Sequence, residues 1–233
     1  MSIPWALIIL TAISSIPVVI VYTWFRLAKY EFSTIWFLFA LLAGAAAFFP
    51  ALILQNLLNF SFASNKVFYH VFVRIAFAEE FSRLLLLLVF FLLNKFLNNQ
   101  TVSYADVKKA SAAGLIAGLG FAILETTLYA ASNSNVLLLR TITAAPLHAA
   151  CGSRIGAAAK LLPSNPVQAI FRILTATAIH GIYNLMISIP GITSLAAVLI
   201  AFTALGSSII TIRGGWTIDI FAESEHNQDH DAR

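Results

Sequence analysis

Residues 67–95 read VFYHVFVRIAFAEEFSRLLLLLVFFLLNK, a mostly apolar run that carries Glu79, Glu80 and Arg83 near its middle. The run is longer than the roughly 20 residues that a helix needs to cross the hydrocarbon core of a bilayer. A charge at the centre of a helix in lipid costs on the order of 2.5–3.5 kcal/mol. We therefore expect these ionisable side chains to face the interior of a helix bundle and to have a function there.

The composition of the whole chain agrees with a lipid environment. Of its 233 residues, 60% are hydrophobic and 10% are charged, and the mean hydropathy is +0.87. A soluble domain has about 25% charged residues, because its surface must stay wet. The net charge of +4 is modest, and the basic residues lie mostly between apolar segments, which argues against a nucleic-acid-binding face. Cys151 is the only cysteine, so an intrachain disulfide and a cysteine-based metal site are excluded.

The apolar segments predict an all-α, polytopic transmembrane bundle of about seven helices. The expected spans are residues 3–24, 34–58, 67–95, 109–131, 136–160, 166–189 and 192–212, with short polar loops at 98–101, 132–135, 163–166 and 190–191. The first segment follows no basic region and has no small-residue cleavage site, which favours a retained helix over a removed signal peptide. Residues 1–213 are predicted to form one transmembrane domain, followed by a polar and mobile tail at 214–233.

Basic residues between the spans predict the orientation. They recur in alternate loops, at Arg26, Lys29, Lys95, Lys108, Lys109, Arg154 and Lys160, whereas the other loops hold only Lys66. Cytoplasmic loops carry the excess of Lys and Arg in membrane proteins. The N-terminus is therefore expected outside the cell and the C-terminus in the cytoplasm.

Polar side chains recur at similar depth in the next three spans. These side chains are Glu125 in the fourth span, His148 in the fifth, and His180 with Asn184 in the sixth. A rise of about 1.5 Å per residue places them, with Glu79, in the central-to-outer half of the bilayer. We expect helices three to six to bring them into one shared pocket.

The spacing of neighbouring residues predicts some local contacts. Glu79 and Arg83 lie four residues apart, where an ion pair can form, and Glu80 lies about 100° around the same helix. Phe121 and Glu125 share one face of the fourth span. In that span Gly114 and Gly118 form a face of small residues that lets a neighbouring helix approach closely.

These groups suit the attack of water on an amide carbonyl, in one of two arrangements. In the first, His148, His180 and Glu125 hold a zinc ion that keeps an open position for water. In the second, no metal is needed, because one imidazole helps a Glu to activate the water while His180 and Asn184 stabilise the oxyanion. The spacing leaves both arrangements open.

The order Glu79-Glu80-x-x-Arg83, Phe121-x-x-x-Glu125, His148 and His180-x-x-x-Asn184 resembles the PrsW family of intramembrane proteases, which is related to the CAAX-processing and bacteriocin-processing membrane proteases. The resemblance covers about Val67 to Leu185. It implies an intramembrane endopeptidase, in a prokaryotic cell membrane, that cuts a membrane-bound or membrane-tethered protein. The residues that it implies as catalytic are Glu79, Glu80, Glu125, His148, His180 and Asn184, supported by Arg83 and Phe121.

The resemblance has two departures and leaves the cofactor open. Arg83 stands where family members often have Lys, and Thr126 follows Glu125 where Asn is common. Zinc and a metal-free glutamate mechanism are both compatible with the related proteases.

Other interpretations compete with a protease. The acids and imidazoles also suit the proton relay of an ion-coupled transporter, although the chain lacks the internal repeats typical of transporters. A non-catalytic binding or immunity protein on the same fold is a further alternative. Individually, the charged groups are also explained by structural ion pairs, and Arg140 by snorkelling outward or by pairing with the carboxylates.

Overall fold

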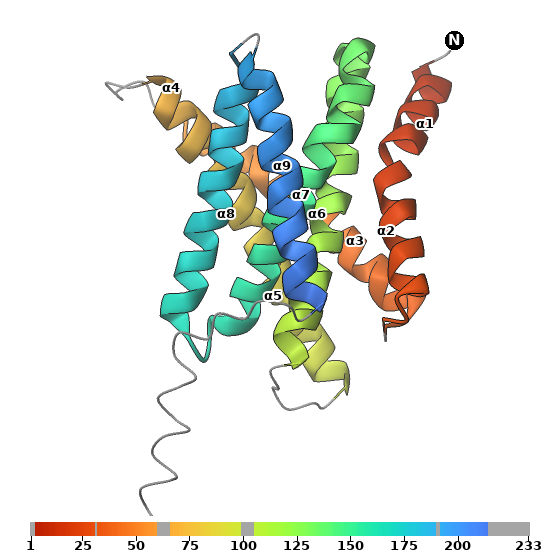
Figure 1. Cartoon of the computed structure of the whole chain (residues 1–233), viewed down its shortest axis with the longest axis vertical. Coiled ribbons are helices and arrows are strands. Elements are labelled where there is room, and N and C mark those ends of the chain that lie inside the picture. Colours follow the sequence, from red (N-terminus) through yellow and green to blue (C-terminus); the bar gives the residue numbers. More distant parts are fainter. Residues whose placement is uncertain (1–2, 31, 60–65, 99–104, 190–191, 214–233) are drawn as a thin grey trace, which may run out of the picture.

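The computed structural model describes residues 3–30, 32–59, 66–98, 105–189 and 192–213, and it is helical with no strand in these ranges (Figure 1). The elements are α1 (Ile3–Ser14), α2 (Ile16–Leu27), α3 (Thr34–Leu57), α4 (Lys66–Phe68), the π-helix η1 (Tyr69–Phe77), α5 (Ala78–Asn98), α6 (Ala105–Ser132), the 3-10 helix η2 (Ser134–Val136), α7 (Leu137–Leu161), α8 (Pro166–Ile187) and α9 (Ile192–Arg213). The predicted all-α fold is confirmed. The tail at 214–233 lies outside the described residues.

Within the described ranges, six helical segments are long and apolar enough to cross a membrane, so the chain is a multi-pass membrane protein. They are Trp5–Leu27, Thr34–Leu57, Val107–Ser132, Ser134–Leu161, Pro166–Ile187 and Leu195–Arg213. The continuous helical stretch from α4 to α5, which carries the charged centre of the third predicted span, is not among them. The count of seven spans and the orientation therefore stay predictions.

Local sequence signals explain where several helices begin and break. The first span is divided between α1 and α2 at Ser15, directly before the Ile16-Pro17 pair that begins α2. Ser33 caps α3 by accepting a hydrogen bond from the backbone N–H of Trp36 at 3.1 Å. Asn165 caps α8 in the same way, and Pro166 occupies the first turn, where its missing N–H is not needed.

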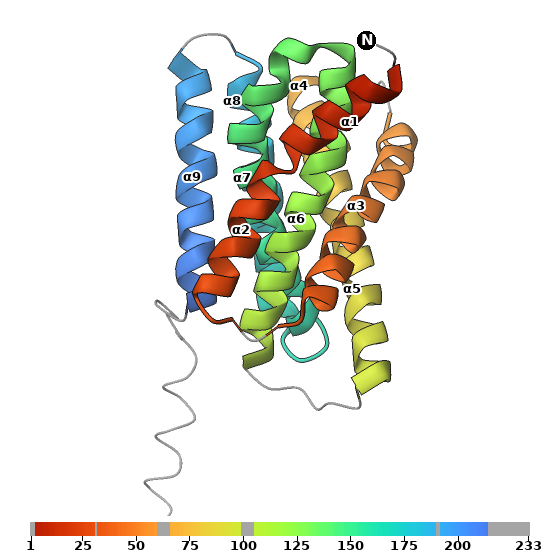
Figure 2. The same cartoon turned by 90° about the vertical axis from the view of Figure 1, so that its right-hand side faces the viewer.

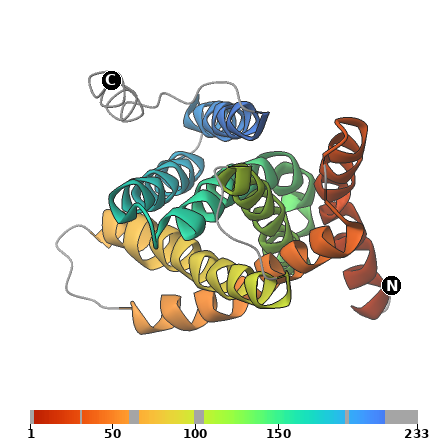
Figure 3. The same cartoon turned by 90° about the horizontal axis from the view of Figure 1, so that it is seen from below.

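The pair α6 and α7 lies at the centre of the bundle, with the other long helices around it (Figures 2 and 3). The two helices approach closely because glycines of one face glycines of the other: Gly114 lies against Gly152 and Gly156, and Gly118 lies against the backbone oxygen of His148. A methyl group on Gly118 would overlap that oxygen. The predicted close contact of the Gly114–Gly118 face is confirmed, and it fixes the position of His148.

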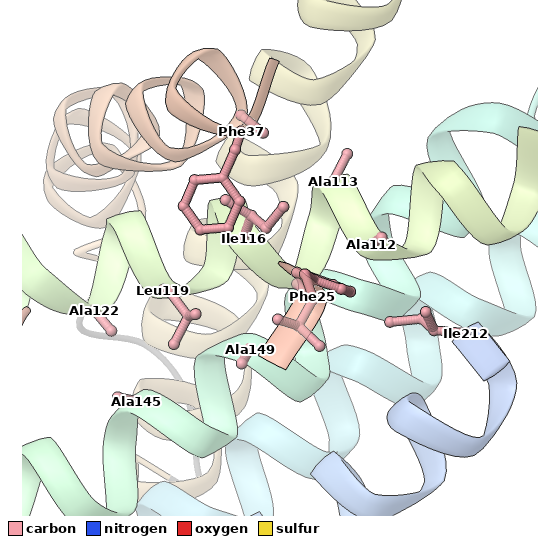
Figure 4. Close-up of a cluster of buried hydrophobic side chains, with 12 residues drawn as sticks. Phe25, Phe37, Ala112, Ala113, Ile116, Leu119, Ala122, Ala145, Ala149 and Ile212 are labelled. Carbon is pink, nitrogen blue, oxygen red and sulfur yellow. The ribbon is translucent and has the colours of Figure 1, made fainter. Parts of the chain in front are cut away.

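An apolar cluster joins the ends of α2, α3 and α9 to this central pair (Figure 4). Phe25 and Phe37 are almost fully buried in it, next to Ile116 of α6 and Ile212 of α9. The hydroxyl of Tyr30 donates to the backbone oxygen of Ile212 at 2.9 Å. This end of the bundle is therefore a packed apolar core.

The distribution of exposed and buried residues is that of a membrane protein. Large apolar side chains cover the outer surface, as shown by Val167, which is 78% exposed, and Leu138, which is 64% exposed. Glu80 and Arg83, by contrast, are 0% exposed. Lipid accepts the apolar exterior, whereas ionisable groups in a bilayer must pair in the interior. The buried ionisable groups of this bundle therefore lie in its interior.

Candidate active site

The site begins where the π-helix η1 passes into α5. π-Helical turns are rare and often occur at functional sites, because the extra residue per turn rotates the side chains that follow. Arg74 of η1 donates from Nε to the backbone oxygen of Gln55 on α3 at 3.0 Å. This contact joins α3 to the turn that precedes Glu79 and Glu80.

Glu80 is held on both of its oxygens. Arg83 donates from one guanidinium nitrogen to Oε2 at 2.6 Å, and Oε1 lies 2.7 Å from Nδ1 of His180 on α8. A carboxylate paired with a guanidinium is an acceptor, so the proton of this second contact is on His180 Nδ1. Glu80 therefore orients His180 and leaves the lone pair on His180 Nε2.

Glu79 is held on one side only. The side-chain amide of Gln55 donates to Oε1 at 3.0 Å, whereas the buried Oε2 has no hydrogen-bond partner in the described part of the chain. Oε2 lies 3.6 Å from Nε2 of His180. The unpaired oxygen of Glu79 and the lone pair of His180 thus face each other inside the bundle.

His148 of α7 has a partner on each ring nitrogen. Arg83 lies 3.1 Å from Nδ1, and Glu125 Oε2 lies 2.7 Å from Nε2. Because guanidinium only donates and carboxylate only accepts, Nε2 carries the proton and Nδ1 accepts. The ring of His148 lies perpendicular to that of His180, with 5.0 Å between the ring centroids.

Glu125 connects this core to the edge of the site. Arg140 of α7 donates to Glu125 Oε2 at 2.6 Å, and its guanidinium lies 4.1 Å above the ring of Tyr129. The Arg140 side chain is 20% exposed, while Glu125 is 11% exposed. Of the two alternatives for Arg140, the structure has the pairing with a carboxylate.

Phe121 closes the apolar side of the cluster. Its ring centroid lies 5.2 Å from that of His148, and the guanidinium of Arg83 lies 4.6 Å from the same ring. Phe121 is 1% exposed. It therefore excludes water from the Arg83–His148 contact and supports the cation through its π face.

The sequence-based expectations differ from the structure in one contact of Arg83. The expected ion pair between Glu79 and Arg83 is wrong, because Arg83 reaches Glu80, three residues away, and Gln55 takes Glu79. The Asn184 side chain is partly buried and has no hydrogen bond to another described residue. Cys151 is buried and lies within an apolar cluster.

Three ligating side chains converge in a way that suits a metal ion. The donor atoms of Glu79, His148 and His180 all lie within 4.8 Å of one another. Two imidazoles and one carboxylate form a ligand set found in catalytic zinc sites. The carboxylate in this group is Glu79, whereas the sequence had suggested Glu125, which instead supports His148 from outside.

Gln55 is the site residue that sequence reasoning missed. It lies near the end of a predicted span, where a polar residue is ordinary, and its contact with Glu79 joins residues 24 apart in the chain. The nine-residue π-helix η1 was also not expected. A carboxamide within an otherwise apolar segment is the only signal that the sequence offered for Gln55.

Comparison with protein families agrees with this arrangement. The model of the PrsW family intramembrane metalloproteases matches residues 33–207, which is most of the chain and includes every side chain of the cluster. No curated protein and no solved structure matches significantly. The match agrees with helices that carry paired acids and imidazoles into the core of a membrane bundle. The chain therefore belongs to the PrsW family of intramembrane metalloproteases, which are peptide hydrolases that act on proteins in the membrane.

Proposed function

We propose that this protein cleaves a membrane-bound or membrane-tethered protein with water that is activated at Glu79, beside the imidazoles of His180 and His148. The observation that carries the proposal is the unpaired Oε2 of Glu79, buried and 3.6 Å from His180 Nε2. A buried carboxylate oxygen without a partner is costly. Hydrolytic water is the group that would satisfy it.

The remaining carboxylates have positioning roles in this proposal. Glu80 fixes the ring and the proton of His180, and Glu125 fixes those of His148. Carboxylates that orient histidines in this way set which nitrogen is available and raise its basicity. In this proposal Glu79 is the reactive carboxylate, and Glu80, its neighbour in the sequence, positions His180.

Asn184 is proposed to contact the substrate. It lies one turn after His180 on α8, and no described side chain uses its amide group. An amide N–H that is aimed at the scissile carbonyl stabilises the negative charge that develops on the oxygen. Asn184 and His180 together would then bind the carbonyl while Glu79 holds the water.

The residues present fit the metal that the family description implies. Glu79 Oε2 and His180 Nε2 are available as ligands, and His148 would give up one of its two hydrogen bonds to become the third. A zinc ion bound there supplies Lewis acidity and makes its bound water more acidic. Without a metal, Glu79 serves as the general base for the same attack.

Cleavage in a defined membrane tests the proposal. The purified protein is reconstituted with single-span reporter proteins, and the products are identified by mass spectrometry. We expect the wild-type protein to cut within or next to the span, and Glu79→Gln to leave the reporter intact while retaining the wild-type Tm. Cleavage by Glu79→Gln at the wild-type rate would remove Glu79 from the mechanism.

Metal analysis of the same preparations separates the two forms of the chemistry. If a metal is bound at this site, the wild-type protein contains about one equivalent, His180→Gln loses it, and chelation abolishes cleavage. If the metal-free protein cleaves at the full rate, Glu79 acts as a general base without an ion. Metal that stays bound in both Glu79→Gln and His180→Gln would place the ion elsewhere.

A further inference from the structure

A polar cavity lies away from the cluster of acids and imidazoles. It has a volume of about 150 Å³. The residues that line it come from α6, α7, α8 and α9, and they are Ser111, Ser153, Arg154, Arg172, Ser208 and Thr211. None of them contributes to the candidate active site. A lining of two guanidinium groups and four hydroxyls is unusual for the interior of a membrane protein, where ionisable groups mark functional sites.

Arg154 is anchored in this cavity by neutral groups. One guanidinium nitrogen donates to Ser208 Oγ and to the backbone oxygen of Ala150, both at 2.9 Å, and the other donates to Ser207 Oγ at 2.6 Å. In the described part of the chain, each partner of this guanidinium is a hydroxyl or a carbonyl, and the lining of the cavity contains no carboxylate. The charge of Arg154 is thus held in place without being neutralised by these groups.

Two serine hydroxyls in the lining have no hydrogen-bond partner among the described residues. Ser111 is 1% exposed and Ser153 is 3% exposed, and neither hydroxyl makes a hydrogen bond with another described residue. Buried hydroxyls are normally hydrogen-bonded, and these two belong to residues that line the cavity. Both residues line the cavity next to Arg154, so a ligand with several acceptor oxygens would satisfy all three side chains at once.

The cavity lies where an anionic headgroup can reach it. Ser111 is near the start of α6, Arg172 near the start of α8, and Thr211 near the end of α9, which places the cavity toward the end of the bundle where α9 finishes (Figure 1). The distribution of basic loops predicts that this end is cytoplasmic. Basic pockets between transmembrane helices on the cytoplasmic side bind phospholipid headgroups.

We propose that this cavity binds a phosphate group, supplied by the headgroup of an anionic phospholipid or by free phosphate. Guanidinium matches the planar spacing of phosphate oxygens and binds them through paired hydrogen bonds. The hydroxyls of Ser111 and Ser153 complete the set of donors. Because Arg154 lies six residues after His148 on α7, a bound phosphate steadies the helix that carries one of the catalytic imidazoles.

Binding is measured as the shift in Tm of the purified full-length protein in neutral detergent. One series adds inorganic phosphate against chloride at constant ionic strength, and a second adds phosphatidylglycerol against phosphatidylcholine. We expect a saturable rise in Tm with at least one phosphate-bearing probe. Response to phosphatidylglycerol alone identifies a lipid headgroup as the source, and response to inorganic phosphate alone identifies a soluble anion.

The double variant Ser111→Ala/Ser153→Ala removes only two oxygen atoms and keeps the fold. It should bind the effective probe about 10- to 30-fold more weakly, since each hydrogen bond contributes about 1 kcal/mol. Arg26→Gln, which removes an exposed charge at the same end of the bundle, should bind as the wild-type protein does. The proposal is overturned if neither probe raises Tm, or if Arg26→Gln and the double variant bind equally well.

Discussion

Nδ1 of His180 lies 2.7 Å from Oε1 of Glu80, across the contact between α8 and α5. The other oxygen of Glu80 is taken by Arg83, whose second nitrogen reaches His148. A single guanidinium therefore connects one histidine directly and the other through Glu80. The two imidazole rings lie perpendicular to each other, with 5.0 Å between their centroids.

Removing Arg83 should destabilise the protein strongly, because its guanidinium is buried. Arg83→Leu leaves the charge of Glu80 buried without its partner, and breaking such a pair costs about 3–5 kcal/mol. The double variant Glu80→Gln/Arg83→Leu removes both charges and keeps an acceptor for His180, so its Tm should recover toward the wild-type value. Thermal unfolding in detergent measures both. A Tm for the double variant below that of Arg83→Leu would contradict the pairing.

The amide of Gln55 should matter for the rate of cleavage. Gln55→Leu frees Oε1 of Glu79 to rotate, and loss of a hydrogen bond that orients a reactive carboxylate typically costs about 10–100-fold in activity. We expect kcat to fall by at least about 10-fold with KM unchanged. Asn56→Leu, next to it on an exposed face of α3, is the matched control and should keep the wild-type kcat. Equal rates for both variants would show that Glu79 does not need Gln55.

Glu125 should act through His148. Glu125→Gln weakens the contact that fixes the His148 proton, and it removes the charge that holds Arg140. The expected result is a fall in kcat of about 10–100-fold with little change in KM. Tyr129→Phe keeps the ring under Arg140 and should cleave normally. A change in KM alone would instead assign Glu125 to substrate binding.

The close approach of α6 and α7 should be sensitive to a single methyl group. Gly118→Ala places that methyl against the backbone oxygen of His148, so the helices must separate, at a cost of about 1–3 kcal/mol for overpacking. Cleavage should fall as His148 moves. Gly206→Ala is the control, because the added methyl group has open space, and it should leave the protein as stable as the wild type or more stable by up to about 1 kcal/mol. Similar Tm values for the two variants would contradict the packing described above.

The boundaries of the helices could be predicted from the sequence because lipid leaves the backbone few alternatives. A chain in a bilayer must satisfy its N–H and C=O groups within each helix, so apolar runs and their punctuation by Pro, Gly and Asn mark the spans. The segment predicted at 166–189, for instance, forms α8 at Pro166–Ile187. The glycine face at Gly114 and Gly118 could also be predicted, because the spacing of the two residues places both on one side of the helix.

The pairing within the site could not be predicted in the same way. Spacing along α5 allows Arg83 to reach either glutamate, and the choice depends on Gln55 of α3 and His180 of α8, which approach from helices distant in the sequence. The π-helix η1 also changes how the residues before Glu79 are presented to their neighbours. Tertiary contacts therefore decide which carboxylate is open.

The division of roles between Glu79 and Glu80 is tested most directly by the cleavage rates of Glu79→Gln and Glu80→Gln, measured side by side on one membrane-anchored reporter. Loss of a general base or of a ligand that holds water costs about 10²–10⁴-fold, whereas loss of an orienting carboxylate costs about 10–100-fold. We predict that Glu79→Gln is the more severely impaired variant by at least about 10-fold, with both proteins folded. Full activity in Glu79→Gln and an inactive Glu80→Gln would contradict the account.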